Sequence, residues 1–126
     1  MTRNLMKVLH IDDSPEICEL YTDLFTADNH EFQSVNRGRE GLELILKNNY
    51  DLILLDICMP EYSGMQLLRD IKKQRPSEIG KIIVVSMLNF NPSQIEELLK
   101  IGIHSVETKP TNLKKLEIIK KNKWLR

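Results

Sequence analysis

Two continuous apolar runs, residues 52–55 and 82–85, constrain the fold of this chain more than any other feature. Each is a run of Leu, Ile or Val (LILL and IIVV) that ends directly at a polar residue. A strand with one face in water alternates apolar and polar residues, whereas a strand buried on both faces is apolar throughout. Burial on both faces is typical of parallel sheets, which are covered by helices. The two runs therefore predict central strands of a parallel sheet.

Segments with helical spacing separate the predicted strands along the chain. Apolar residues recur every three or four positions between strands predicted at residues 5–11, 31–35, 52–55, 82–85 and 103–108. Ser14, Asn91 and Thr111 stand where helix N-caps are expected, and proline follows the first two directly. Strand and helix thus alternate five times. This order predicts an α/β fold with a doubly wound, five-stranded parallel sheet and helices on both faces.

Length and composition limit the class of protein. The 126 residues correspond to one domain, and we expect residues 1–126 to form it. An apolar fraction of 41% with 29% charged residues is that of a globular protein, and no apolar run approaches a membrane span. The N-terminus does not resemble a secretory signal, and the two cysteines lack a CxxC spacing. We expect a cytoplasmic protein with free thiols and no membrane partner.

Polar residues that can carry chemistry follow four of the predicted strands. The first strand ends in Asp12 and Asp13, the third in Asp56, the fourth in Ser86 and the fifth in Lys109. Parallel strands place their carboxyl ends at one edge of the sheet, where the functional sites of such folds lie. A single aspartate after a strand is more often a turn former or helix cap than a site residue. The specific signal is the combination of all four strand ends.

Three carboxylates at one edge would repel one another unless a cation lies between them. Mg²⁺ suits such a site best, because it takes one or two carboxylates, keeps waters and accepts phosphate oxygens. Lys109 adds a cation and Ser86 a hydroxyl donor, so the edge could also receive a tetrahedral oxyanion. Asp56 is the best acceptor, because it stands between the acid pair and these two residues. Carboxylates that form aspartyl-phosphate are established nucleophiles.

Four stretches of the chain resemble the receiver domain of two-component response regulators. They are VLHIDDSPEI, YDLILLDICMPEYSG, IIVVSM and the Lys109-Pro110 pair, and the pattern from Asp56 to Gly64 is the most specific of them. The resemblance extends over residues 5 to about 120 and is nearest to stand-alone receivers of the chemotaxis-regulator kind. It implies a flavodoxin-like (βα)5 fold with strand order 2-1-3-4-5.

The resemblance also assigns the metal site residue by residue. Asp56 matches the phosphoacceptor, which is also a metal ligand, and Asp13 matches the direct ligand of Mg²⁺, or of Mn²⁺ in its place. Asp12 matches the acid that acts on the metal mainly through water. The backbone carbonyl of Cys58 matches the remaining protein ligand.

The remaining matches concern phosphotransfer and switching. Lys109 matches the lysine that pairs with phosphoryl oxygens, and Ser86 the hydroxyl that moves to them on activation. The resemblance implies a sensor histidine kinase or phosphotransfer protein as phosphodonor, and a switch rather than an enzyme with an external substrate. It implies an output protein and a possible homodimer on the face of the fourth helix, fifth strand and fifth helix. The sequence leaves no room for an output domain after that helix, so we expect either a separate output partner or an output region outside this sequence.

Some positions depart from the common pattern. The family usually has Tyr or Phe three residues before the lysine, where this chain has Val106, so the switch pair would be a serine and a valine. Met87 replaces a usually small residue and could narrow access to the phosphoacceptor. Cys58 and Leu88 stand where polar residues often orient a hydrolytic water, so we expect slow autodephosphorylation. Val106 and Met87 keep one alternative open, namely a protein-interaction module that works without phosphate.

The charge distribution bears on the partner. The formal net charge is zero, but residues 109–126 hold seven basic residues and one acid, so the rest of the chain is acidic. The segment lacks interleaved aromatics and a helix-turn-helix pattern, which makes a nucleic-acid partner unlikely. We expect Lys120 and Lys121 to steer an acidic partner or a second copy. A flavin site is disfavoured because the first loop reads DDSP, and a DxD phosphatase because the acids are adjacent.

Overall fold

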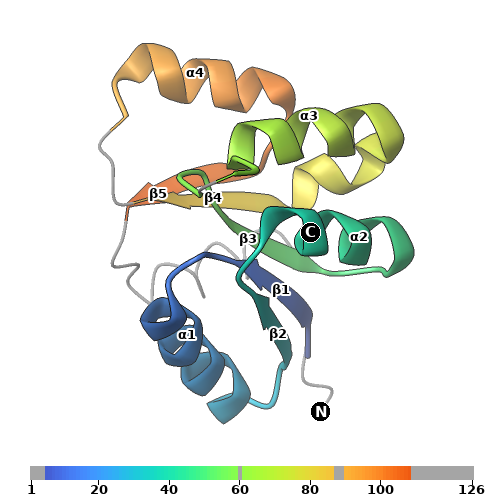
Figure 1. Ribbon diagram of the computed structural model, residues 1–126, viewed down its shortest axis with the longest axis vertical. Coiled ribbons are helices and arrows are strands. Elements are labelled where there is room, and N and C mark those ends of the chain that lie inside the picture. The colour runs from blue at the N-terminus through green and yellow to red at the C-terminus, as the bar shows by residue number, and fades with distance from the viewer. Residues whose placement is uncertain (1–4, 60, 87–89, 109–126) are drawn as a thin grey trace.

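The computed structural model describes residues 5–59, 61–86 and 90–108. In them, five parallel strands form one sheet in the order β2-β1-β3-β4-β5 (Figure 1). The strands are β1 (Lys7–Ile11), β2 (Glu31–Val35), β3 (Leu52–Asp56), β4 (Ile82–Ser86) and β5 (Ser105–Thr108). The predicted parallel sheet and its strand order are confirmed. The helix predicted from Thr111 and the basic segment 109–126 lie outside the described residues.

The described helices are α1 (Pro15–Ala27), α2 (Gly38–Lys47), α3 (Gly64–Gln74) and α4 (Pro92–Ile101), with a 3-10 helix, η1 (Pro76–Lys81). Two predicted N-caps are confirmed: the Ser14 side chain accepts from Ile17 N, and Asn91 forms a reciprocal capping box with Gln94. Gly102 ends α4 at φ +110°, a conformation that favours glycine. The sequence did not predict η1, because six residues that begin at a proline carry no apolar stripe.

Two strands begin later than predicted. The first starts at Lys7, because the N–H of Met6 donates to His30 Nδ1 (3.1 Å) and not to a neighbouring strand. The fifth starts at Ser105, although Ile103 is buried (5% exposed). Apolar residues therefore continue past a strand end when they still pack in the core.

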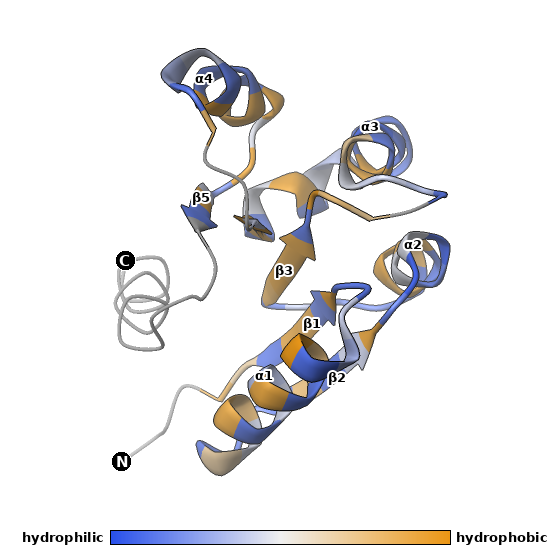
Figure 2. Cartoon of the chain, turned by 60° about the vertical axis from the view of Figure 1, so that its left-hand side comes forward, coloured by the Kyte–Doolittle hydropathy of each residue, from blue (hydrophilic) through white to orange (hydrophobic). Residues whose placement is uncertain are grey.

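The sheet separates two hydrophobic cores. On one face, α1 covers β1, β3 and β4 with Tyr21 and Phe25. On the other face, α2, α3 and α4 contribute buried side chains such as Ile45, Leu68 and Leu98. Figure 1 shows α1 on the opposite side of the sheet from α2 and α3, and Figure 2 shows the apolar character of β3 between them. All five residues of β3 are buried, as its apolar run predicts.

No helix within the described ranges has the length and apolar character needed to cross a membrane. The longest of them, α1, has 13 residues, whereas a membrane span needs about 20.

The strand order reverses between β1 and β3, which are neighbours although the chain passes through β2 between them. Ile11 pairs with Leu55, so both strands end at the same level. Asp56 pairs with Val85 and Ser86 with Thr108, which brings the ends of β4 and β5 to that edge too. The carboxyl edge of the sheet at this reversal is therefore the expected place for a site.

Candidate functional site

Three carboxylates meet at the ends of β1 and β3. Asp12, Asp13 and Asp56 each place one oxygen so that these atoms lie within 4.8 Å of one another. Asp12 is 0% exposed and Asp56 5% exposed, whereas Asp13 is exposed. Opposite oxygens around Mg²⁺ are about 4.2 Å apart, since each metal–oxygen bond is about 2.1 Å long. The three aspartates thus fit one small divalent cation between them.

Asp12 is held by backbone and side-chain groups on several sides. Its Oδ1 accepts from the N–H of Ser14 (2.9 Å), and its own N–H donates to the carbonyl of Val35 (3.1 Å). Its Oδ2 lies 3.6 Å from Nε2 of the buried His10. Ser14 is also the N-cap of α1, so one short turn both begins that helix and fixes the carboxylate.

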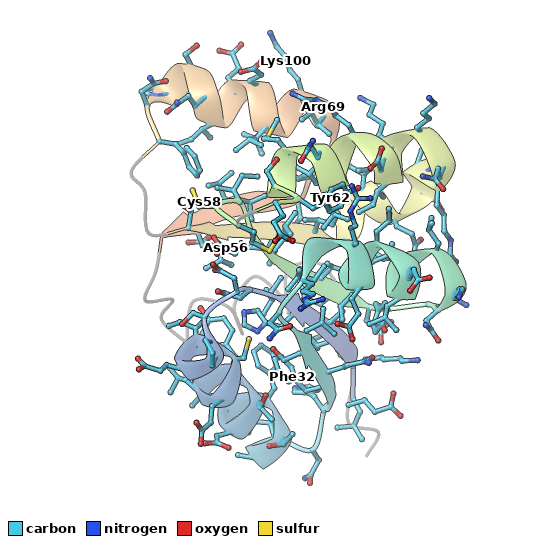
Figure 3. The ribbon with its side chains drawn as sticks, viewed as in Figure 1. Phe32, Asp56, Cys58, Tyr62, Arg69 and Lys100 are labelled. Carbon is cyan, nitrogen blue, oxygen red and sulfur yellow. The ribbon has the colours of Figure 1, made fainter. Side chains whose placement is uncertain are left out.

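Asp56 is held by the loop that follows it. Its Oδ1 accepts from the N–H of Cys58 (3.1 Å), and Figure 3 shows both residues at the same end of the sheet. The N–H of Gly64 donates to the carbonyl of Ile57 (3.1 Å), which ties the start of α3 to this loop. A Cβ at Gly64 would lie 2.7 Å from Cα of Ile57 and 2.9 Å from the carbonyl oxygen of Asp56. The backbone behind Asp56 therefore requires glycine here.

The other predicted site residues differ in burial and position, and one of them lies outside the described residues. Ser86 is 0% exposed at the end of β4, the strand beside β3. Val106 lies in β5 opposite Val84, where it is half-buried and packs against the core on the α4 side. The side chain of Cys58 is exposed and free. Lys109, together with Met87 and Leu88, lies outside the described residues.

Sequence reasoning missed a polar cluster behind the loop. Tyr62 is buried, its hydroxyl donates to the carboxylate of Asp70, and Arg39 lies 4.7 Å over its ring. Figure 3 shows Tyr62 between α2 and α3. Burial, followed by the hydrogen bond to Asp70 and its charge, raises the pKa of Tyr62, against the opposing effect of Arg39. These residues come from three segments, and no spacing rule relates them.

Sequence reasoning also missed His10 and Ser34. The sequence did contain a signal for His10, because it is a polar residue inside an apolar strand. It also lies two residues before Asp12, and residues two apart in an extended strand share a face.

Comparison with known proteins agrees with this geometry. The family model for the response regulator receiver domain matches residues 8–120. The chain belongs to the response regulator receiver family. Receiver domains are the phosphoacceptor domains of two-component signalling, and the resemblance found in the sequence is thereby confirmed at the level of the family.

Two solved receivers share the fold. The receiver domain of the Francisella response regulator 1452 superposes with a TM-score of 0.79 at 31% identity, covering 94% of this chain and 98% of that one. The receiver domain of sensor histidine kinase PA1611 of Pseudomonas aeruginosa PAO1 has a TM-score of 0.80 at 20% identity, covering 94% and 96%. It was solved with a magnesium ion coordinated in its active-site cleft.

Curated relatives of this receiver are often longer. A protein-glutamate methylesterase/protein-glutamine glutaminase of Archaeoglobus fulgidus is 35% identical over 106 residues, which are 83% of this chain and 30% of that protein. Three bacterial regulators that also match are covered over 44% to 51% of their length. The chain thus spans between 30% and 51% of the length of these relatives, and what it shares with them is the receiver.

Proposed function

We propose that this receiver takes a phosphoryl group onto Asp56 from the phosphohistidine of a sensor histidine kinase or a phosphotransfer protein, with Mg²⁺ or Mn²⁺ bound by Asp12, Asp13 and Asp56. The convergence of these three carboxylates at the ends of β1 and β3 carries the proposal. The backbone carbonyl of Cys58 is the proposed remaining protein ligand. When bound, the metal supplies positive charge against the carboxylates and the transferred group.

The residues of the chain position the reacting groups. The Cys58 N–H holds Asp56 Oδ1 and so fixes the rotation of the carboxylate. In the proposed step a carboxylate oxygen attacks phosphorus in line with the leaving nitrogen, and the new P–O bond forms as the P–N bond breaks. The electron pair of that bond stays on the imidazole nitrogen of the donor. Lys109 is proposed to pair with the phosphoryl oxygens, because an ammonium offsets the charge that develops there.

Ser86 and Val106 are the proposed switch residues. Ser86 is buried beside β3, so its hydroxyl can donate to a phosphoryl group on Asp56 after a short movement. Val106 packs on the α4 side, where a coupled change would alter the surface formed by α4 and β5. We propose that this surface, with the segment after β5, signals to an output protein or a second copy. The receiver is then a cytoplasmic switch, and with Cys58 beside the acceptor its autodephosphorylation is slow.

The test is phosphorylation by a small phosphodonor. Incubation with acetyl phosphate and Mg²⁺ should add the mass of one phosphoryl group, and Asp56→Asn should abolish the gain. Asp23→Asn, the same change at an exposed position of α1, should keep it. Chelation of the metal should also prevent it.

No mass gain in the folded wild-type protein would contradict the proposal. It would favour the phosphate-free interaction module, for which the ring-less Val106 in β5 is the motivating observation. A half-life of seconds for the phosphorylated protein would contradict only the prediction of slow autodephosphorylation and would leave the phosphorylation of Asp56 standing.

A further inference from the structure

A histidine is buried inside the central sheet beside the acid cluster. His10 is 1% exposed and lies in β1 between Leu9 and Ile11, which are both wholly buried. Its ring is 4.7 Å from the ring of Tyr21 and 5.9 Å from that of Phe32, measured between centroids. Aromatic contacts from α1 and β2 thus fix the plane of the imidazole, and with it the direction of both ring nitrogens.

Both nitrogens face polar groups. Nδ1 is 2.9 Å from Oγ of Ser34, the residue that pairs with His10 across the β1–β2 ladder. Nε2 is 3.6 Å from Oδ2 of Asp12, two residues along the same strand and on the same face. A carboxylate oxygen only accepts, so the favourable arrangement carries hydrogen on Nε2. In the neutral ring with that tautomer, Nδ1 accepts the hydrogen of the Ser34 hydroxyl.

This arrangement makes a chain of donors that ends on a metal-site carboxylate. The 3.6 Å separation is longer than a hydrogen bond, so the last link is a charge–dipole contact. It acts on Oδ2, whereas the Ser14 N–H acts on Oδ1. Asp12 is 0% exposed, so protein groups and not bulk water determine the orientation of its carboxylate.

We propose that His10, oriented by Ser34, is a positioning residue that fixes Asp12 for the divalent cation and thereby sets the affinity of the receiver for Mg²⁺. The inference rests on the proposed function, because it assumes that the aspartates bind the metal. His10 is not itself a ligand, since its nitrogens face Ser34 and Asp12. Among the described residues, the group able to hold a metal consists of the three aspartates. Groups in contact with ligating carboxylates commonly change metal affinity when they are replaced.

Three substitutions at His10 separate positioning from packing. The amide nitrogen of His10→Gln can take the place of Nε2, and that of His10→Asn the place of Nδ1. His10→Leu keeps an apolar side chain but no donor. By titration calorimetry with Mg²⁺, we expect His10→Leu and His10→Asn to bind roughly tenfold more weakly than wild type, and His10→Gln within about threefold of it.

Val8→Ala is the matched control, because Val8 is a wholly buried residue of β1 in the same core as Tyr21. It should lower the free energy of unfolding and leave Mg²⁺ affinity unchanged. A second readout is the side-chain ¹⁵N spectrum of the wild type. It should show His10 with hydrogen on Nε2, and the Nε2 resonance should shift on Mg²⁺ addition. A histidine without contact to Asp12 would not respond in this way.

The outcomes distinguish the two proposals. Unchanged affinity in His10→Asn, or equal weakening in His10→Asn and His10→Gln, overturns the positioning role; this comparison holds even if His10→Leu does not fold. A stationary Nε2 resonance overturns it as well. In each of these cases wild-type Mg²⁺ binding and phosphorylation of Asp56 still stand. A wild-type protein that binds no Mg²⁺ contradicts the proposed function itself.

Discussion

The three aspartates of the site differ in how the protein holds them. Asp12 and Asp56 are buried and each accepts a backbone N–H, from Ser14 and Cys58 respectively. Asp13 is exposed, and water can solvate its charge. Without a cation, the three carboxylates repel one another across less than 4.8 Å, a cost that the folded state carries and the unfolded chain does not.

Asp13→Asn should therefore stabilise the metal-free protein. We expect a gain of about 0.5–1 kcal/mol in the free energy of unfolding, kept small because solvent screens this exposed group. The same variant should lose most of the stabilisation that Mg²⁺ gives the wild type, since that stabilisation depends on the affinity of the folded state for the ion. Urea unfolding with chelator and with Mg²⁺ measures both effects. Asp23→Asn should change neither, and a destabilised Asp13→Asn protein would contradict the prediction.

Gly64 offers a test of the backbone behind Asp56. A Cβ would lie 2.7 Å from the backbone of Ile57, which has little room to move, so Gly64→Ala should cost about 1–3 kcal/mol. Gly80→Ala is the matched control, because a Cβ there has nothing within 4 Å. We expect it to change stability by less than about 0.5 kcal/mol. Equal urea midpoints for both variants would show that the loop adjusts freely.

At the scale of elements, Arg75 joins α2, α3 and η1 at the edge of the molecule away from the site. Nη1 of Arg75 donates to the carbonyls of Ile45 (2.6 Å) and Asn48 (2.7 Å) at the end of α2. Its Nη1 also lies 3.9 Å from the carboxylate of the buried Glu78 in η1, which Lys81 contacts at 3.0 Å. Arg75 itself follows the last residue of α3. It therefore fixes α2, α3 and η1 to one another.

Arg75→Ala should destabilise the fold by about 2–4 kcal/mol, because it removes the donor to two carbonyls and one cation from a buried acid. Arg75→Lys should recover little, since an ammonium lacks the planar fork that reaches several acceptors. Arg69→Ala, at an exposed position of α3, should be near neutral. The free energy of unfolding in urea measures all three, and full recovery by lysine would mean that charge alone matters.

At the scale of the whole molecule, the larger core holds two tyrosines whose hydroxyls bond to polar side chains. The Tyr50 hydroxyl donates to Oε1 of Gln33 (3.0 Å), and the Tyr62 hydroxyl donates to the carboxylate of Asp70. Burial raises the pKa of both phenols above the ordinary value of 10.0, and Asp70 raises that of Tyr62 further. The unfolded chain thus loses these protons at lower pH than the folded protein does.

Because the folded pKa values are raised, the contribution of these tyrosines to stability is complete below about pH 10 and declines as the pH rises above it. Each group can lower the free energy of unfolding by up to about 1.4 kcal/mol per pH unit in that range. Tyr62→Phe should be less stable at neutral pH, through loss of the bond to Asp70, and should show a shallower decline above pH 10. Urea midpoints measured at fixed ionic strength from neutral pH to above pH 10 give the decline of stability with pH. A Tyr62→Phe protein whose stability declines as steeply as that of the wild type would contradict the contribution assigned to Tyr62.

The sequence was informative where the physical cause is local or periodic. Apolar runs identified β3 and β4 because burial on both faces leaves no polar position. Ser14 and Asn91 identified helix starts because a cap acts within three residues. The convergence of the site acids could be predicted because parallel strands end at one edge of a sheet, and the structure brings Asp12, Asp13 and Asp56 together there.

The tertiary structure alone decided what depends on the approach of distant segments. That His10 lies between Ser34 and Asp12 follows from the register of β1 against β2, which strand periodicity does not specify. The contact of Arg39, Tyr62 and Asp70 joins two helices and a loop. Residue type and order in the sequence thus determined which functional groups lie at the ends of the strands. Packing determined which other side chains orient them, because distances between side chains depend on the whole sheet and its helices.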